Sequence, residues 1–168
     1  MRLPTRLAAA LLPFVIIPLQ LAAQKPTLPL AKPVLFVCEH GTVRSLLAKV
    51  MFEEYAAQVG LNMQAVSRGT NADSIVPPWM LQGLAGDHVA LGSWRPQTLR
   101  ASDVTNASMV VSFDLPATAI KGASAPRAHW DSLPSVSRDY AVGRDAIKVR
   151  VHHLVDSLKQ ATVGTRKR

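Results

Sequence analysis

The sequence predicts an α/β domain built on a parallel sheet, and two observations support this. Four short apolar or mixed runs have the length of strands, and each is separated from the next by a segment of helix or loop length. The first run is apolar throughout, as strands buried on both faces of a parallel sheet are. Alternating strands and helices indicate βαβ units. The four runs are residues 34–37, 63–67, 109–113 and 125–130.

Residues 1–23 have the features of a secretory signal peptide. Two arginines precede an apolar run over residues 7–21, and two alanines at 22–23 supply a small-residue cleavage region. The run is shorter than the roughly 20 residues of a spanning helix, and prolines interrupt it, so we expect no membrane anchor. The sequence therefore predicts an exported protein, periplasmic or secreted, that is cleaved near Ala23.

The composition of the whole chain is that of one soluble domain. The chain has 168 residues, of which 48% are hydrophobic and 18% charged. Cleavage removes two arginines and no acid, so the net charge falls from +8 to +6 and still attracts anions of every class. Aromatic residues are sparse and do not alternate with basic ones, so we expect no nucleic-acid partner. We divide the mature chain into an exposed lead-in (24–33), a domain (34–160) and a basic tail (161–168).

Cys38 is the only cysteine of the chain. A single cysteine in an exported protein excludes an internal disulfide and a cysteine-rich zinc site, so Cys38 is either a core residue or a reactive thiol. Its neighbours favour the reactive thiol, because it directly follows the buried run 34–37 and precedes a helical pattern. In parallel α/β units such a connection lies at the carboxyl edge of the sheet, where ligands bind.

The helical pattern begins right after this connection. Apolar residues recur at threes and fours, and Gly60 suits the end of the helix. Cys38 then lies at a helix N-terminus, where N–H groups and the helix dipole form an anion site and favour the thiolate. Arg44 adds a fixed positive charge that can hold an oxyanion through two hydrogen bonds. The pattern therefore predicts a nucleophile beside an oxyanion clamp. The apolar residues are Leu46, Leu47, Val50, Met51, Tyr55 and Val59.

The segment "CEHGTVRS", directly after "VLFV", has the spacing Cys-x5-Arg-Ser. It resembles the catalytic loop of the low-molecular-weight protein tyrosine phosphatases and of the arsenate reductases that share their fold. Later segments resemble further family elements, so that the likeness runs from residue 34 to about residue 158. It implies a three-layer, doubly wound sheet of four parallel strands with helices on both faces. The later segments are "VSRGT" (66–70), the stretch 79–99, "MVVSFD" (109–114) and "AHWDSLP" (128–134).

The resemblance also implies an activity and the residues that carry it. The family hydrolyses phosphomonoesters of the phosphotyrosine type through a cysteinyl phosphate, without a cofactor. Cys38 matches the nucleophile, Arg44 matches the residue that holds the equatorial oxygens, and Ser45 matches the serine that stabilises the thiolate. The expected partner is a phosphate ester or another tetrahedral oxyanion, including a phosphotyrosine protein. We expect the rest of the loop to bind it as well, namely Glu39, His40, Gly41, Thr42 and Val43.

The loop departs from the family pattern at three positions. The family has Gly-Asn where this chain has His40 and Gly41. Gly41 can adopt the left-handed backbone that the asparagine would adopt, but it offers no side-chain hydrogen bond to brace the loop. Glu39 repels a dianion unless its carboxylate points to solvent. His40 either tunes the charge of the loop or is an exposed histidine without a task.

The general acid is the larger departure. The family uses an aspartate of an Asp-Pro pair, and residues 133–134 are Leu-Pro here. Asp131 is the nearest substitute, and two readings stay open: Asp131 donates the proton to the leaving group, or it only braces the turn. Positioned proton transfer is typically worth 10²–10⁴-fold, so without an acid alkyl phosphates are poor substrates.

Two further functions compete with phosphatase activity. An arsenate reductase of the thioredoxin-linked kind uses two more cysteines, which this chain lacks, so reduction would depend on Cys38 and an external thiol. A non-catalytic relative would bind an oxyanion or a phosphoprotein without turnover. No metal site is expected, because the adjacent His152 and His153 point to different parts of a helix surface. That helix is predicted over residues 138–159, with an apolar stripe typical of a core-facing helix.

Overall fold

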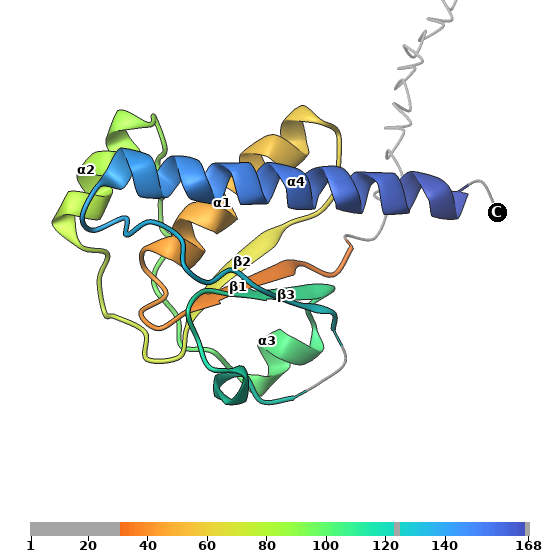
Figure 1. The fold of residues 1–168 in the computed structure, drawn as a ribbon, viewed down its shortest axis with the longest axis horizontal. Helices are drawn as coiled ribbons and strands as arrows, with labels where there is room; N and C mark the ends of the chain where they lie inside the picture. Colours follow the sequence, from red (N-terminus) through yellow and green to blue (C-terminus); the bar gives the residue numbers. More distant parts are fainter. Residues whose placement is uncertain (1–30, 123–124, 167–168) are drawn as a thin grey trace, which may run out of the picture.

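The computed structural model describes residues 31–122 and 125–166 (Figure 1). The predicted signal peptide and residues 24–30 of the predicted lead-in therefore lie outside the described residues. Within the two described ranges, no helix combines the length and the apolar character needed to cross a membrane.

The sheet has four parallel strands in the order β2-β1-β3-β4. β1 lies in the interior of the sheet, with Val34 opposite Ala65 of β2 and Met109 of β3. Each run predicted from the sequence overlaps one strand, although β1 continues to Cys38, β2 begins and ends two residues after its run, and β4 is shorter than its run. The predicted α/β class and parallel sheet are confirmed. The strands are β1 (Val34–Cys38), β2 (Ala65–Gly69), β3 (Met109–Ser112) and β4 (Arg127–His129).

Helices cover both faces of the sheet, as predicted (Figure 1). One face packs against α1 (Arg44–Gln58), α2 (Pro78–Gly86) and α4 (Tyr140–Arg166). The other face packs against α3 (Ala101–Thr105), a short helix that the sequence pattern did not predict. The helix predicted over 138–159 is present as α4, which continues into the predicted basic tail.

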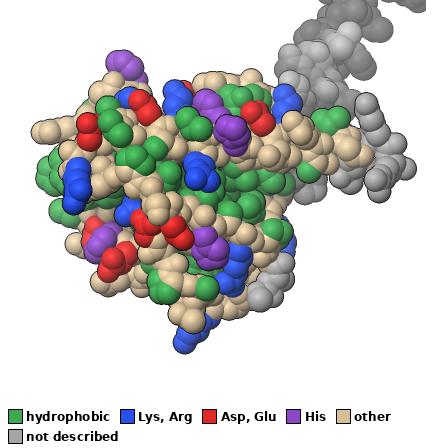
Figure 2. Space-filling model, viewed as in Figure 1, with side chains coloured by type: hydrophobic (Ala, Val, Ile, Leu, Met, Phe, Trp, Pro, Cys, Tyr) green, Lys and Arg blue, Asp and Glu red, His purple; other side chains and the backbone are tan. Residues whose placement is uncertain are grey.

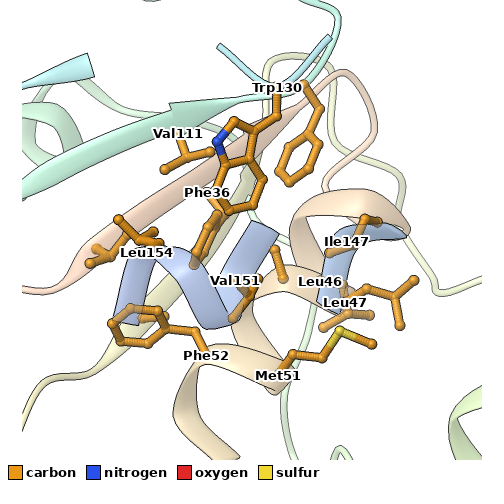
Figure 3. Packing of buried hydrophobic residues seen from close by; sticks show 14 of the residues in the cluster. Phe36, Leu46, Leu47, Met51, Phe52, Val111, Trp130, Ile147, Val151 and Leu154 are labelled. Atoms are coloured by element: carbon orange, nitrogen blue, oxygen red, sulfur yellow. The ribbon is translucent and has the colours of Figure 1, made fainter. Parts of the chain in front are cut away.

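The larger core lies between β1, α1 and α4, around Phe36 (Figure 3). The ring centroid of Phe36 is 6.0 Å from that of Phe52 on α1 and 5.9 Å from that of Trp130, which follows β4. Side chains alternate along a strand, so Phe36 and Cys38 share one face, while Leu35 and Val37 face α3. The same alternation therefore places the thiol on the α1 side of the sheet.

Tyr140 fixes α2 against α4. A Cβ at Gly83 would lie 2.3 Å from the Tyr140 ring, so the close contact of the two helices requires glycine there. The Tyr140 hydroxyl donates to Asp87 (2.7 Å), and Arg144 pairs with the same carboxylate (2.5 Å). Burial raises the pKa of Tyr140, and the hydrogen bond to Asp87 raises it further. These contacts join the C-terminal end of α2 to the first turns of α4.

Candidate active site

Two glycines allow the loop after β1 to lie against the end of β2. Gly41 has φ +72°, and a Cβ there would lie 2.7 Å from the backbone nitrogen of Gly69. The left-handed conformation expected of Gly41 is confirmed. A Cβ at Gly69 would in turn lie 2.8 Å from the carbonyl carbon of His40. Each glycine therefore leaves space that the other segment's backbone occupies.

Backbone hydrogen bonds join the loop to the segment that leaves β2. The N–H groups of residues 70, 71 and 73 donate to the carbonyl oxygens of residues 38, 39 and 40, at 3.0, 2.8 and 3.1 Å. These bonds use the loop carbonyls and fix the peptide planes from Cys38 to His40. Main-chain contacts therefore hold the first part of the loop, which lacks the bracing asparagine side chain of the family.

The sulfur of Cys38 lies among hydrogen-bond donors. The Gly41 N–H donates to Sγ at 3.2 Å, and the Ser45 hydroxyl lies 3.0 Å from Sγ. Behind them is Ser67 of β2, which is fully buried, with its hydroxyl 2.9 Å from Ser45 Oγ and 3.0 Å from the Gly41 carbonyl oxygen. When the sulfur is a thiolate, the Ser45 hydroxyl donates a hydrogen bond to it, and the Ser67 hydroxyl donates one to Ser45 Oγ. Donors aimed at an anion stabilise it.

Arg44, the first residue of α1, forms an ion pair with Asp114. Asp114 lies just beyond the end of β3, at the carboxyl edge of the sheet. Its N–H donates to Asp131 Oδ1, and its Oδ1 accepts from the Ser132 N–H, both at 3.0 Å. Asp131 therefore reaches the guanidinium only through Asp114. A guanidinium carries five N–H donors, so one carboxylate contact does not exhaust it.

A cavity of about 420 Å³ opens over the thiol. The cavity is lined by residues of the loop, of the segment that runs from β2 to the start of α2, of the segment just after β3, and of the segment before α4. The structure thus brings together most of the loop predicted to bind substrate. Asp131 is not among the described residues that line the cavity, and its role as the acid stays a prediction. The lining residues are Cys38, Glu39, His40, Val43, Arg44, Asp73, Pro77, Trp79, Phe113, Asp114, Ser135, Val136 and Ser137.

The three other predicted site residues, Gly41, Thr42 and Ser45, lie behind the cavity and shape the loop. The buried Thr42 hydroxyl donates to Asp73 Oδ2 at 2.7 Å. Asp73 Oδ1 lies 3.1 Å from Nδ1 of His40, whose Nε2 is 3.8 Å from the Glu39 carboxylate. One imidazole therefore lies between two carboxylates at the mouth of the cavity.

A comparison with protein families identifies the family to which the chain with this loop belongs. The sequence model described as "Low molecular weight phosphotyrosine protein phosphatase" matches residues 33–129, more than half of the chain. The chain belongs to the low molecular weight phosphotyrosine protein phosphatase family. This match confirms the resemblance inferred from the Cys-x5-Arg-Ser loop. No curated protein sequence matches the chain.

Solved structures share the fold of this phosphatase-family chain. A thioredoxin-dependent arsenate reductase of Corynebacterium glutamicum has a TM-score of 0.67 at 19% identity, covering 80% of this chain and 65% of its own. A low molecular weight protein tyrosine phosphatase of Bacillus subtilis has a TM-score of 0.63 at 23% identity, with coverages of 76% and 97%. An arsenate reductase of Archaeoglobus fulgidus has a TM-score of 0.60 at 24% identity, with coverages of 73% and 98%. The doubly wound fold is thus confirmed.

Several residues of this phosphatase-family site were not predicted from the sequence, and four of them bear on its chemistry. Asp114 carried a usable signal, because a polar residue directly after a buried strand lies at the ligand-binding edge of a parallel sheet. Ser67, Asp73 and Trp79 carried none, since each reaches the site through tertiary contacts with segments far away in the sequence.

Proposed function

We propose that this protein is a phosphomonoester hydrolase that acts through a cysteinyl-phosphate intermediate. The supporting observation is the surroundings of Cys38: its sulfur accepts from the Gly41 N–H, lies 3.0 Å from the Ser45 hydroxyl, and shares one cavity with Arg44. A thiolate stabilised at a helix N-terminus is a competent nucleophile. The guanidinium beside it suits the planar, two-pronged recognition of phosphate oxygens.

The reaction proceeds in two displacements at phosphorus. The Cys38 thiolate attacks phosphorus and forms the P–S bond, while the P–O ester bond breaks and the leaving oxygen takes the electron pair and a proton from solvent or from Asp131. Water then attacks phosphorus and gives a proton to solvent or to Asp131, the P–S bond breaks, sulfur recovers its electron pair, and inorganic phosphate leaves. In both steps Arg44 and backbone N–H groups at the start of α1 hold the equatorial oxygens.

Turnover of an activated aryl phosphate tests this proposal. A nitrophenolate leaving group departs without a proton, so its ester reports on Cys38 and Arg44 independently of the acid. We expect the mature protein to hydrolyse 4-nitrophenyl phosphate and Cys38→Ser to abolish turnover. Undiminished turnover by the serine variant contradicts the mechanism, and absence of turnover by the wild-type protein favours a non-catalytic oxyanion-binding relative.

Arsenate reduction is the second candidate, because arsenate has the shape of phosphate and fits the same oxyanion site. The chain has a single cysteine, so each reduction would leave an oxidised product for an external thiol to resolve. Hydrolysis requires only water as the second reactant, which is why we favour it. Arsenate-dependent consumption of glutathione by the wild-type protein, absent in Cys38→Ser, would transfer the assignment to reduction.

We also propose a phosphotyrosine protein outside the cytoplasm as the physiological partner. The support is the family resemblance together with the charged and apolar pattern of residues 1–23. Fractionation of cells that produce the full chain, followed by N-terminal sequencing, tests the location. A mature N-terminus near residue 24 in the exported fraction is expected, and an uncleaved chain in the cytoplasm contradicts it.

A further inference from the structure

The charges at the mouth of the cavity do not match an ordinary phosphate dianion. Arg44 is the one arginine or lysine among the described lining residues, and it is already paired with Asp114. Two more carboxylates, Glu39 and Asp73, line the same cavity. The three carboxylates outnumber Arg44 and His40, whose imidazole lies between Glu39 and Asp73, so the entrance repels a doubly negative ester.

The acidic side chains are held at this entrance by specific contacts. Asp73 accepts from the buried Thr42 hydroxyl and faces His40, and Glu39 lies on the other side of the same imidazole. The Glu39 side chain is 65% exposed, so its carboxylate is free to meet a ligand that enters from solvent. On the face drawn in Figure 2, acidic and histidine side chains lie next to one another at the lower left.

An aromatic side chain completes this entrance. Trp79, in the first turn of α2, lines the same cavity and is 38% exposed. An indole face attracts cations through its quadrupole, most strongly among the aromatic side chains. Carboxylates and an exposed indole together form a surface that favours positive charge, beside a loop that favours a tetrahedral oxyanion.

We propose that this site selects phosphate monoesters whose leaving group carries a positively charged nitrogen. The inference rests on the proposed phosphatase function and adds the class of leaving group. The phosphoryl group lies at Cys38 and Arg44, while the cation of the leaving group lies among Glu39, Asp73 and Trp79. A cationic leaving group offsets the repulsion that the two carboxylates impose on the dianion, and a neutral one does not.

Three aryl phosphates with matched leaving-group pKa test the proposal. One carries a trimethylammonio group on the ring, one a neutral electron-withdrawing group, and one a sulfonate, and all are measured in EDTA to exclude bridging metals. We expect kcat/KM to fall in that order, by about fivefold per step, the scale of an exposed ion pair with a cation–π contact. Added salt compresses the differences.

Two variants test whether Glu39 and Trp79 cause the preference for the cationic ester. Glu39→Gln and Trp79→Leu each lower the ratio of kcat/KM for the cationic ester to that for the neutral ester. Because both esters meet the same enzyme preparation, this ratio is insensitive to partial misfolding. The matched control is Glu54→Gln. Glu54 is an exposed carboxylate on α1 that accepts a hydrogen bond from Gln58 and does not line the cavity, so we expect the ratio to stay unchanged.

The outcomes separate this proposal from the function on which it rests. If no ester is hydrolysed, the phosphatase function fails and this proposal fails with it. If all three are hydrolysed at equal kcat/KM, the function stands and the preference for a cation is wrong. A preference that survives Glu39→Gln and Trp79→Leu together also overturns the proposal, because the selectivity then arises elsewhere.

Discussion

The loop from β1 to α1 and the segment from β4 to α4 both reach the cavity, but they are built differently. In the first, the proposed nucleophile, its donors and the proposed oxyanion clamp belong to one stretch of eight residues, 38–45. In the second, Asp131 points its Oδ1 at the Asp114 N–H, and the residues that line the cavity are Ser135, Val136 and Ser137.

The difference predicts that nucleophile activation and leaving-group protonation can be perturbed separately in this fold. The thiol, its two donors and the arginine lie in one short stretch at a helix N-terminus, and Gly69 and Ser67 of β2 support that stretch from outside it. Protonation depends on where a longer segment positions one carboxylate, and here the contacts of Asp131 support Asp114 and, through it, Arg44. Each prediction below perturbs one side of this comparison, beginning with the largest effect.

Arg44→Lys should produce the largest loss. An ammonium cannot make the two-pronged contact with phosphate oxygens, so we expect kcat/KM for an aryl phosphate to fall by about 10²–10³-fold. The far-UV circular dichroism spectrum should not change. Arg150→Lys on the exposed face of α4 is the control and should keep full activity. A fully active Arg44→Lys variant shows that Arg44 is not the oxyanion clamp.

Gly69→Ala should distort the loop from behind. Its Cβ would lie 2.8 Å from backbone atoms of His40 and Ala72, so the loop must shift. We expect the free energy of unfolding in urea to fall by about 1–3 kcal/mol, the usual cost of overpacking, with activity reduced as well. Gly86→Ala is the control, since nothing lies within 4 Å of its Cβ. Equal stability of the two variants contradicts the close packing of the loop against β2.

Ser67→Ala should lower the reactivity of the Cys38 sulfur, which Ser67 reaches through Ser45. Loss of the hydroxyl removes the support of Ser45, and we expect kcat/KM to fall about tenfold, the equivalent of roughly 1.4 kcal/mol. Alkylation of Cys38 by iodoacetamide should slow in parallel, which a purely structural role of Ser67 would not cause. Ser157→Ala, whose hydroxyl donates to a carbonyl on α4, is the control. Unchanged alkylation would separate Ser67 from the thiol.

Asp131→Asn should have the smallest effect and the most informative pattern. The amide oxygen can still accept from the Asp114 N–H, so a bracing role predicts a loss of about threefold or less, the same for phenyl phosphate and 4-nitrophenyl phosphate. Asp131→Ala, which cannot accept that bond, should slow both esters further and equally. If Asp131→Asn instead slows phenyl phosphate far more than the activated ester, Asp131 is the general acid.

The sequence specified the elements with strong local patterns. The apolar run 34–37 and the helical spacing after Arg44 predicted β1 and α1, and with them the position of Cys38. The five-residue α3 was missed because it buries only Val104 and leaves no periodicity to detect.

The placement of the thiol beside the arginine was predictable because the residues of the loop are consecutive. The partners of the loop were not, because they come from other strands and helices: Ser67 from β2, Asp114 after β3 and Trp79 from α2. Asp131 shows the same limit, since sequence position left its two roles open and the hydrogen bond to Asp114 is a tertiary contact.

Trapping of the covalent intermediate is the most direct test of the cysteinyl-phosphate mechanism. The wild-type protein is mixed with an aryl phosphate labelled at phosphorus, quenched in acid within one turnover, and digested for mass spectrometry. We expect one labelled phosphoryl group on the sulfur of Cys38, and none in Cys38→Ala. Hydrolysis that proceeds with unlabelled Cys38, or with the label on another residue, contradicts it.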